Sequence, residues 1–230
     1  MDSKKENNKR LKLFNYYDTN KDKWSDSNPG NKLIAEERKI TLKEILKKHN
    51  LNLADKKILE VGSGAGTVMS LLIKLGAIED NLYGVDIRDE KIKICKDFFP
   101  KANVYKMDAK KITFEDNYFD IIVTFTLFSS IKNDGSRKIV SEQITRLLKP
   151  NGTIIYYDFR YSNPLNRIVS GVSFQEIKDM FPNFQIDLAL ITLFPFLSRK
   201  ICSVFPSFYV HLKKIKFLKS HLIGVLKNIN

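Results

Sequence analysis

The sequence predicts an α/β fold in which a mostly parallel β-sheet carries helices on both faces. Short apolar runs typical of buried parallel strands alternate along the chain with segments of helical period. In the stretch 56–67 (KKILEVGSGAGT), one such run leads directly into three alternate glycines and a further apolar segment. Polar residues close several of the expected strands, at the edge where parallel sheets bind ligands.

The expected elements follow in order along the chain. Apolar residues separated by charged ones over 33–49 predict an amphipathic helix ahead of the first strand. Strands are expected at 58–61, 82–85, 104–107, 120–125, 153–159, 186–193 and 221–226. Further helices are expected at 68–75, 90–99, 136–148 and 173–180.

Composition narrows the classes of protein. The 230 residues suffice for one well-buried domain, and 39 Lys and Arg against 26 Asp and Glu give a net charge of +13. Because the lysines are spread along the chain, compositional bias is the first interpretation, an anionic substrate the second and nucleic acid the last. Two distant cysteines and three scattered histidines predict no disulfide and no metal site. A polar N-terminus and the absence of a long apolar run predict a cytoplasmic protein without a transmembrane segment.

The glycine turn predicts a nucleotide pocket, because backbone N–H groups and a helix N-terminus would face the ligand there. Its spacing differs from the dinucleotide pattern G-x-G-x-x-G. Glu60 ends the first strand, where a carboxylate suits a cationic ligand better than a pyrophosphate. Asp86 ends the second strand 20 residues after Gly66, the distance expected of a ribose-binding acid, although it could simply cap the next helix.

The pattern E-x-G-x-G-x-G at 60–66 resembles the first motif of class I S-adenosylmethionine-dependent methyltransferases of the type 11-like group. The run LLKPNGT at 147–153 resembles the turn before their fifth strand. The resemblance covers 56–152 with specific motifs. It implies a Rossmann-like seven-stranded methyltransferase fold, whose antiparallel last strand lies between the fifth and sixth. The methyltransferase domain would span 51–230, after an N-terminal lid or helical segment over 1–50.

The resemblance also implies how S-adenosylmethionine, and its product S-adenosylhomocysteine, would bind. The glycines would wrap the methionine part, Asp86 the ribose and Asp108 the adenine amino group, with Ile87 against the adenine face. The expected cofactor-binding residues are Glu60, Gly62, Ser63, Gly64, Gly66, Asp86, Ile87, Met107, Asp108, Ala109 and Phe125.

Catalytic residues are expected at the ends of the fourth and fifth strands. The loop beginning at Thr126 is where methyl group and acceptor should meet, and the histidine that many relatives carry there is absent. Asp158 is the best candidate base, unless it only pairs with Arg160; Glu36 or Glu37 would serve if the N-terminal helix closed over the site. Arg160 suits an acceptor carboxylate or phosphate.

These features predict methyl transfer to oxygen of a small, anionic, sugar- or phosphate-containing acceptor. The residues Trp24, 28–31, 37–38 and 157–160 resemble small bacterial methyltransferases associated with surface-polysaccharide or capsule biosynthesis. The alternatives are RNA or protein methylation, a non-catalytic cofactor-binding partner and a dinucleotide oxidoreductase. Aromatic residues before residue 33 would form a lid or pack on the surface. The apolar and basic segment 194–219 is interpreted as an insertion: a helical cap, a homodimer contact or a peripheral membrane element.

Overall fold

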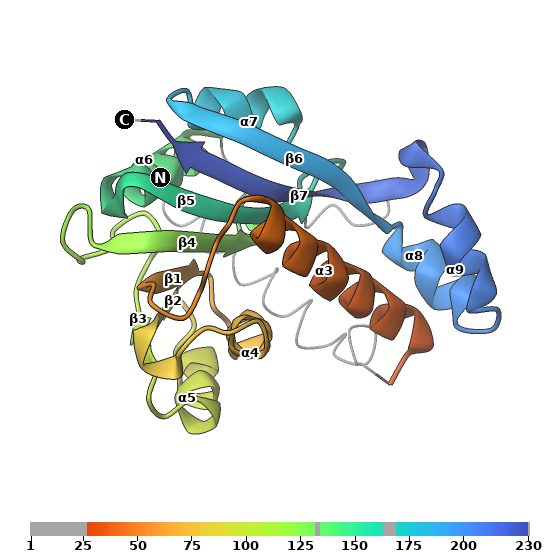
Figure 1. Ribbon diagram of the computed structural model, residues 1–230, viewed down its shortest axis with the longest axis horizontal. Coiled ribbons are helices and arrows are strands. Elements are labelled where there is room, and N and C mark those ends of the chain that lie inside the picture. Colours follow the sequence, from red (N-terminus) through yellow and green to blue (C-terminus); the bar gives the residue numbers. More distant parts are fainter. Residues whose placement is uncertain (1–26, 132–133, 163–168, 230) are drawn as a thin grey trace, which may run out of the picture.

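A twisted sheet organises the computed structural model, which describes residues 27–131, 134–162 and 169–229 (Figure 1). Within these residues the sheet has seven strands in the order β3-β2-β1-β4-β5-β7-β6. The strands are β1 (Ile58–Val61), β2 (Leu82–Asp86), β3 (Asn103–Lys106), β4 (Phe119–Phe125), β5 (Leu148–Phe159), β6 (Phe184–Leu193) and β7 (Lys219–Asn228). The predicted aromatic lid lies mostly before residue 27, outside the described part of the chain.

The helices connect these strands and flank the sheet. They are α3 (Pro29–Lys48), α4 (Thr67–Lys74), α5 (Asp89–Phe98), α6 (Asp134–Leu147), α7 (Phe174–Met180), α8 (Pro195–Leu197) and α9 (Ser207–Leu212). Short helical turns are η1 (Glu79–Asn81), η2 (Phe128–Ser130), η3 (Ser198–Cys202) and η4 (Lys216–Leu218). No helix in the described part of the chain has the length and apolar character needed to cross a membrane.

The strand pairing confirms the predicted fold class. β1 pairs in parallel with β2 and β4, and β4 pairs in parallel with β5. β7 is antiparallel to both β5 and β6 and lies between them, as the family resemblance implied. The register between β5 and β7 sets Phe159 opposite His221. This pairing brings a residue from the last strand to the carboxyl end of β5.

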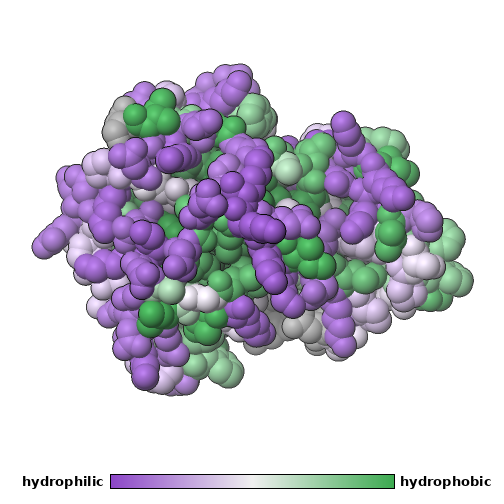
Figure 2. Space-filling model, viewed as in Figure 1, coloured by the Kyte–Doolittle hydropathy of each residue, from purple (hydrophilic) through white to green (hydrophobic). Residues whose placement is uncertain are grey.

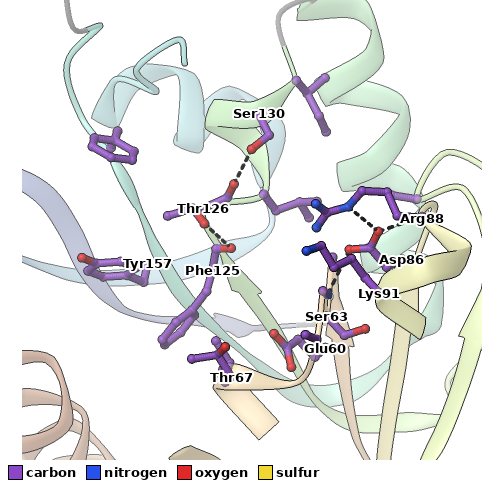
Figure 3. Close-up of a pocket in the computed structure, with 18 of the residues that line it drawn as sticks. Glu60, Ser63, Thr67, Asp86, Arg88, Lys91, Phe125, Thr126, Ser130 and Tyr157 are labelled. Carbon is purple, nitrogen blue, oxygen red and sulfur yellow. Dashed lines mark hydrogen bonds and ion pairs between the residues drawn. The ribbon is translucent and has the colours of Figure 1, made fainter. Parts of the chain in front are cut away.

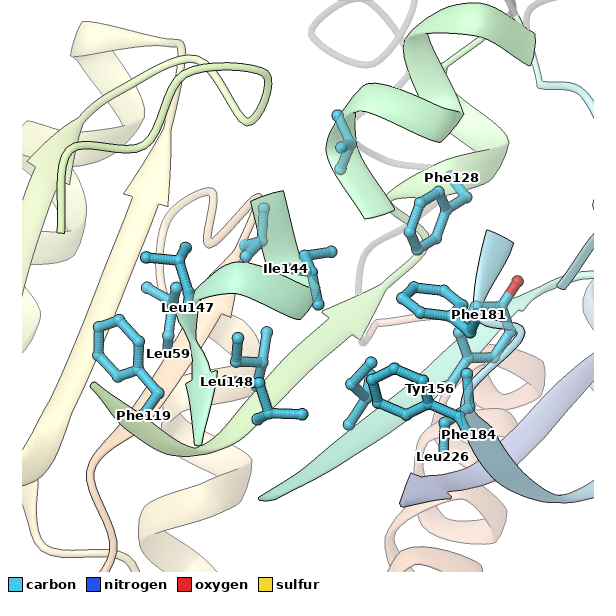
Figure 4. Packing of buried hydrophobic residues seen from close by; sticks show 14 of the residues in the cluster. Leu59, Phe119, Phe128, Ile144, Leu147, Leu148, Tyr156, Phe181, Phe184 and Leu226 are labelled. Carbon is cyan, nitrogen blue, oxygen red and sulfur yellow. The ribbon is translucent and has the colours of Figure 1, made fainter. Parts of the chain in front are cut away.

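The core is divided by the sheet into two clusters. Figure 4 shows the cluster in which α6 and α7 cover one face, with Ile144 beside Leu147 and Leu148 and with Phe181 beside Tyr156. The opposite cluster joins α3, α4 and α5 to the other face and includes Tyr157. Because successive strand residues point to opposite faces, Tyr156 and Tyr157 belong to different clusters.

The segment 194–219 folds as a helical cap against the start of α3. Asn28 Oδ1 accepts the Gly30 N–H at 2.8 Å and begins this helix. A side chain on Gly30 would lie 2.2 Å from the carbonyl oxygen of Ser198, so only glycine permits this close approach. Cys202 and Tyr209 are buried in a small cluster that includes Leu33 and Ile34 of α3. The insertion is therefore anchored to the helix that covers the carboxyl end of the sheet.

Candidate active site

A cavity of about 670 Å³ lies at the carboxyl ends of the central strands, beneath α3 (Figure 3). It brings together nearly all of the residues that the sequence predicted for the cofactor. Those that line it are Glu60, Gly62, Ser63, Gly64, Asp86, Ile87, Met107, Asp108, Ala109, Phe125 and, of the catalytic candidates, Thr126. The walls also include residues of α3, the helix considered as closing over the site, and residues of β7 and the insertion, which the sequence did not indicate.

The glycine turn is fixed by hydrogen bonds to β2. Gly62, Gly64 and Gly66 have φ angles of 82°, 53° and 85°, which glycine adopts without strain. The N–H groups of Gly62 and Ser63 both donate to the carbonyl oxygen of Val85, at 2.8 and 3.0 Å. These groups are therefore used inside the protein, and the expectation that they face a ligand is wrong.

Gly66 has a structural role in this turn and does not line the cavity. It precedes α4, and a Cβ atom there would lie 2.5 Å from Cε2 of Phe99 and 2.9 Å from Sγ of Cys95. The missing side chain therefore lets α5 pack against the turn. The prediction that Gly66 contacts the cofactor is not supported by this placement.

Glu60 presents an unsatisfied carboxylate oxygen at the cavity. The residue is 3% exposed, and its Oε2 has no hydrogen-bond partner in the described structure. Burial, followed by the negative charge of Asp86, raises the pKa of Glu60 well above its usual range. A backbone hydrogen bond from Met69 and the charge of Arg38 act in the opposite direction, but Oε2 itself has no donor among the described residues. A buried carboxylate oxygen without a partner is unfavourable, so it needs a cation or a donor. The arrangement fits the ammonium group of a ligand such as S-adenosylmethionine.

Asp86 holds the glycine turn and the start of the next helix together. Its Oδ2 accepts the Gly64 N–H at 2.9 Å. Its Oδ1 accepts the Arg88 backbone N–H at 2.9 Å and Nε at 3.3 Å, which Figure 3 shows from the cavity side. The carboxylate is thus oriented at the cavity wall. A ribose hydroxyl that donated to Asp86 Oδ1 would bind the same oxygen as the Arg88 side chain.

Thr126 closes β4 in an unusual backbone conformation. Its φ of 52° lies in the left-handed region, where residues with a Cβ atom are strained. Its Oγ1 donates to the carbonyl oxygen of Phe125, and its own carbonyl oxygen accepts from Ser130 Oγ, both at 2.8 Å (Figure 3). The hydroxyl is thus used locally, and the bend carries the backbone along the cavity wall.

Asp158 and Arg160 do not line the cavity, contrary to their predicted catalytic roles. Asp158 is fully buried, because its neighbours Tyr157 and Phe159 take the cavity side of β5. Its oxygens accept the N–H groups of Ser129 and Phe159 at 3.1 and 2.8 Å, and burial raises its pKa to about 6. It does not pair with Arg160, whose guanidinium lies 4.0 Å from the ring centroid of Tyr161.

The two further candidate bases, Glu36 and Glu37, are also outside the cavity. Glu36 forms an exposed ion pair with Lys39 at 3.4 Å. Glu37 Oε2 accepts from Thr192 N at 3.2 Å and from the hydroxyl of Tyr209 at 2.6 Å. Glu37 therefore ties α3 to β6 and the insertion.

Arg38 is a cavity residue that the sequence analysis did not assign to the site. Its guanidinium carbon lies 5.4 Å from the ring centroid of Tyr157 and 5.9 Å from that of Phe125. Its Nε is buried and has no hydrogen-bond partner in the described structure. None of the ion pairs between described residues includes Arg38. The cavity therefore contains a cation with unused donor capacity.

His221 is the second residue that was missed. It is 3% exposed and stacks on Tyr157, with ring centroids 4.7 Å apart. Ser220 Oγ lies 3.1 Å from the carbonyl oxygen of Thr192 and 2.8 Å from His221 Nδ1. When the Ser220 hydroxyl donates to the carbonyl, Nδ1 carries the ring hydrogen and Nε2 keeps its lone pair. Burial, followed by the charge of Arg38, lowers the pKa of His221 to about 3, so the ring is neutral at neutral pH.

Comparisons with known proteins find methyltransferases similar to the central part of this chain. Residues 59–156 match a family described as "Methyltransferase domain". The ubiquinone/menaquinone biosynthesis C-methyltransferase UbiE of Paraburkholderia xenovorans is 25% identical over 136 residues, which cover 57% of this chain and 55% of that protein. The chain thus spans about half the length of the curated relatives it matches.

Solved structures show the same fold at low sequence identity. The N-methyltransferase NodS from Bradyrhizobium japonicum, in complex with S-adenosylhomocysteine, has a TM-score of 0.64 at 13% identity and covers 89% of this chain and 90% of its own. A methyltransferase from Archaeoglobus fulgidus has a TM-score of 0.59 at 17% identity and covers 84% and 96%.

The sheet order and the solved structures show a Rossmann-like methyltransferase fold. Within it, residues 59–156 are similar to a methyltransferase domain, in the region where the motif at 60–66 resembles class I S-adenosylmethionine-dependent methyltransferases.

Proposed function

We propose that the protein transfers a methyl group from S-adenosylmethionine to a small anionic acceptor. The observation that carries the proposal is the unsatisfied Glu60 carboxylate, buried beside the glycine turn and facing the cavity. A buried carboxylate without a partner favours a cationic ligand and disfavours a diphosphate. A dinucleotide oxidoreductase is the class of enzyme that this electrostatic arrangement opposes.

The cofactor would lie along the ends of β1, β2 and β4. Glu60 would bind its ammonium group, Asp86 the ribose hydroxyls and Asp108 the adenine amino group. Apolar side chains on either side of Asp108 would contact the adenine ring. Bound S-adenosylmethionine supplies an electrophilic methyl group on a sulfonium. The protein then mainly has to hold the acceptor in line with that group.

Arg38 takes the anion-binding role that the sequence assigned to Arg160. It reaches the cavity from α3, and its Nε lacks a partner in the described structure. A guanidinium binds a carboxylate or a phosphate through two parallel hydrogen bonds. The rings of Tyr157 and Phe125 would pack against the guanidinium group of Arg38 and orient it. These contacts favour an acceptor whose negatively charged group lies close to Arg38, next to the rings of Phe125 and Tyr157.

His221 would orient the nucleophilic group of this acceptor. In the tautomer whose Nδ1–H donates to Ser220 Oγ, Nε2 has a lone pair and can accept a hydrogen bond from a hydroxyl. The same nitrogen can receive the proton that the hydroxyl loses during methyl transfer. Because the charge of Arg38 contributes to the low pKa of His221, an anion bound at Arg38 would raise that pKa and strengthen the base.

The identity of the acceptor is the finer part of the proposal. Oxygen of a sugar- or phosphate-containing compound in glycan biosynthesis remains our first candidate, on the sequence pattern and the position of Arg38. A ring carbon is the second, because aromatic side chains of Phe125, Tyr157, Phe159 and His221 line the cavity, and a relative is named as a quinone C-methyltransferase. We further propose that the protein acts in the cytoplasm, as a monomer or a homodimer.

The cofactor assignment is tested by calorimetric titration with S-adenosylhomocysteine. Replacing Asp86 by Asn should weaken binding about 100-fold, since a charge-assisted hydrogen bond to the ribose contributes about 2–3 kcal/mol. The matched control is Asp89→Asn, which removes an exposed acid of α5 outside the cavity and should leave affinity unchanged. Equal affinity of wild type and Asp86→Asn, or tighter binding of NAD than of S-adenosylhomocysteine, would reject the assignment.

The acceptor assignment is tested with methyl-labelled S-adenosylmethionine and paired compounds that differ by one anionic group, such as glucose and glucose 6-phosphate or a phenol and its carboxylated form. Label should pass to the anionic member of a pair. The Arg38→Gln variant should lose about tenfold or more in kcat/KM for it, while its affinity for S-adenosylhomocysteine stays near that of wild type. Preference for the neutral member, or unchanged kinetics in Arg38→Gln, would contradict an anionic acceptor bound at this residue.

A further inference from the structure

The insertion at 194–219 exposes a group of large apolar side chains at one end of the molecule. Six of them are more than half exposed: Phe196, Val204, Phe205, Phe208, Val210 and Phe217. In Figure 1 the insertion, with α8 and α9, projects beyond the edge of the sheet, and Figure 2 shows hydrophobic and hydrophilic residues mixed over this end. We call these six side chains and the basic residues among them the insertion face.

This exposure belongs to a folded element and not to an unpacked loop. Tyr209 is 3% exposed and donates to Glu37, while its neighbours Phe208 and Val210 face outward. The rings of Phe205 and Phe208 lie 5.8 Å apart, so the turn between η3 and α9 presents them together. The insertion thus has a buried side against α3 and an apolar outer side.

The charged residues within the segment 194–219 all have one sign. Within 194–219 the basic residues are Arg199, Lys200, Lys213, Lys214, Lys216 and Lys219, and the segment contains no Asp or Glu. Lys200, Lys214 and Lys216 are exposed, and the Nζ of Lys200 lies 5.0 Å from the ring centroid of Phe196. Apolar side chains interleaved with lysines suit the boundary of an anionic bilayer, where rings enter the acyl region and ammonium groups meet phosphates.

The charge also argues against the main alternative occupant, a second copy of the chain. A symmetric dimer through the insertion face would bring two sets of these cations together with no acid from either segment to pair with them. An anionic surface neutralises the same residues. The net charge of +13 on the whole chain acts in the same direction.

We propose that the insertion face docks the protein peripherally on an anionic lipid bilayer. Pro195 and Arg199 of the same segment line the cavity, so docking brings the cavity next to the lipid surface. The docking itself does not depend on the function proposed above. Its consequence does rest on that function: the acceptor would be encountered at the bilayer surface.

The test is co-sedimentation of the full chain with vesicles, carried out with S-adenosylhomocysteine present. Binding is expected to vesicles of phosphatidylcholine with phosphatidylglycerol, to fall with added salt, and to be weak on phosphatidylcholine alone. The affinity of the double variant Phe205→Ser/Phe208→Ser for these vesicles should fall at least about tenfold. A Lys214→Glu/Lys216→Glu variant should lose binding to the anionic vesicles in particular. The matched control is Phe98→Ser, which removes a 71% exposed phenylalanine of α5 and should bind as wild type does.

Three outcomes would overturn the docking. They are equal binding to neutral and anionic vesicles, wild-type binding by Phe205→Ser/Phe208→Ser, and a dimer in analytical ultracentrifugation that this double variant dissociates. Calorimetry with S-adenosylhomocysteine on each variant separates this proposal from the proposed function. Vesicle binding without affinity for that compound would leave docking supported and reject the methyltransferase assignment. Affinity for S-adenosylhomocysteine without vesicle binding would support the methyltransferase assignment and reject the docking.

Discussion

The cofactor side and the acceptor side of the cavity differ in how the chain builds them. On the cofactor side, Glu60, the glycine turn and Asp86 follow directly from the ends of two neighbouring strands, and short backbone hydrogen bonds join them. On the acceptor side, Arg38 and His221 are far apart in sequence and come from α3 and β7. They meet only because β7 inserts beside β5 and α3 packs across the strand ends.

The two sides therefore depend on different kinds of interaction. The cofactor side depends on local backbone geometry, in particular on positive φ angles that only glycine adopts without cost. The acceptor side depends on burial and electrostatics among distant residues, such as the effect of Arg38 on the pKa of His221. A substitution on the cofactor side should mainly change the stability of the glycine turn. A substitution on the acceptor side should mainly change the protonation of His221.

The largest expected effect is on the stability of the turn, in Gly66→Ala. A methyl group there would be strained by a φ of 85° and would overlap the ring of Phe99. The left-handed conformation costs roughly 1–2 kcal/mol, and forcing the ring to move adds about 1–3 kcal/mol. We expect unfolding in urea to show a loss of about 2–5 kcal/mol, the sum of the two costs.

Gly76→Ala is the matched control for this substitution. Gly76 also has a positive φ, 104°, but a Cβ atom there would meet nothing within 4 Å. It should lose only the cost of the backbone conformation, roughly 1–2 kcal/mol. If both variants lost the same free energy of unfolding, the packing role that we assign to Gly66 would be wrong.

The same division explains how much of the fold could be predicted from the sequence. All seven strands were expected, because parallel strands buried on both faces form continuous apolar runs such as 58–61. The last strand is longer than expected, Lys219–Asn228 instead of 221–226, because pairing with β6 and β5 on both sides extends it. For 194–219 the sequence left a helical cap, a homodimer contact and a peripheral membrane element open, because α8 and α9 are held by contacts with α3 that the sequence does not show.

Site residues could be placed from the sequence where their location depends only on their position at the end of one strand. Asp86 could be placed because a carboxylate at the end of β2 reaches the neighbouring turn. Asp158 could not be placed, since the sequence shows that it lies on β5 but not which face of the sheet each residue takes near the strand end. The register of β7 beside β5 decides this, and it places His221 at the cavity. No local signal in the sequence indicates that pairing.

The second effect concerns the acceptor side and appears as a pH dependence of stability. His221 has a pKa of about 3 in the folded protein and near 6.5 when unfolded, so below pH 6.5 the unfolded chain binds the extra proton. The stabilisation from the neutral ring is complete above pH 6.5 and is lost as pH falls toward 3. Relative to His221→Asn, wild type should lose about 2 kcal/mol between pH 6.5 and pH 5.

The measurement is urea unfolding of both proteins across that range, so that only their difference is interpreted. This matters because Asp158 and Glu60, whose pKa values are raised, contribute with the opposite sign in both proteins. His211→Asn is the matched control, since His211 is exposed on α9. A difference between wild type and His221→Asn that does not change with pH would show that the ring is not held neutral.

The smallest expected effect tests the electrostatics of the cofactor side. In the empty cavity the raised pKa of Glu60 favours its protonated form, whereas the ammonium group of S-adenosylhomocysteine favours the carboxylate. Binding should therefore release a proton. Affinity should rise by at most about tenfold per pH unit below the raised pKa, equivalent to about 1.4 kcal/mol, and level off above it. Calorimetric titration in two buffers of different ionisation enthalpy measures the protons released.

Glu60→Gln should bind S-adenosylhomocysteine more weakly and release no proton, because the amide cannot ionise. Glu90→Gln, which alters an exposed acid on α5, should release as many protons as wild type does. If Glu60→Gln kept the pH dependence of wild type, the proton would come from another group. The Glu60 carboxylate would then not be the counter-charge of the cofactor's ammonium group. The two sides of the cavity would differ more sharply, because electrostatic effects on ligand binding would be confined to the acceptor side, around Arg38 and His221.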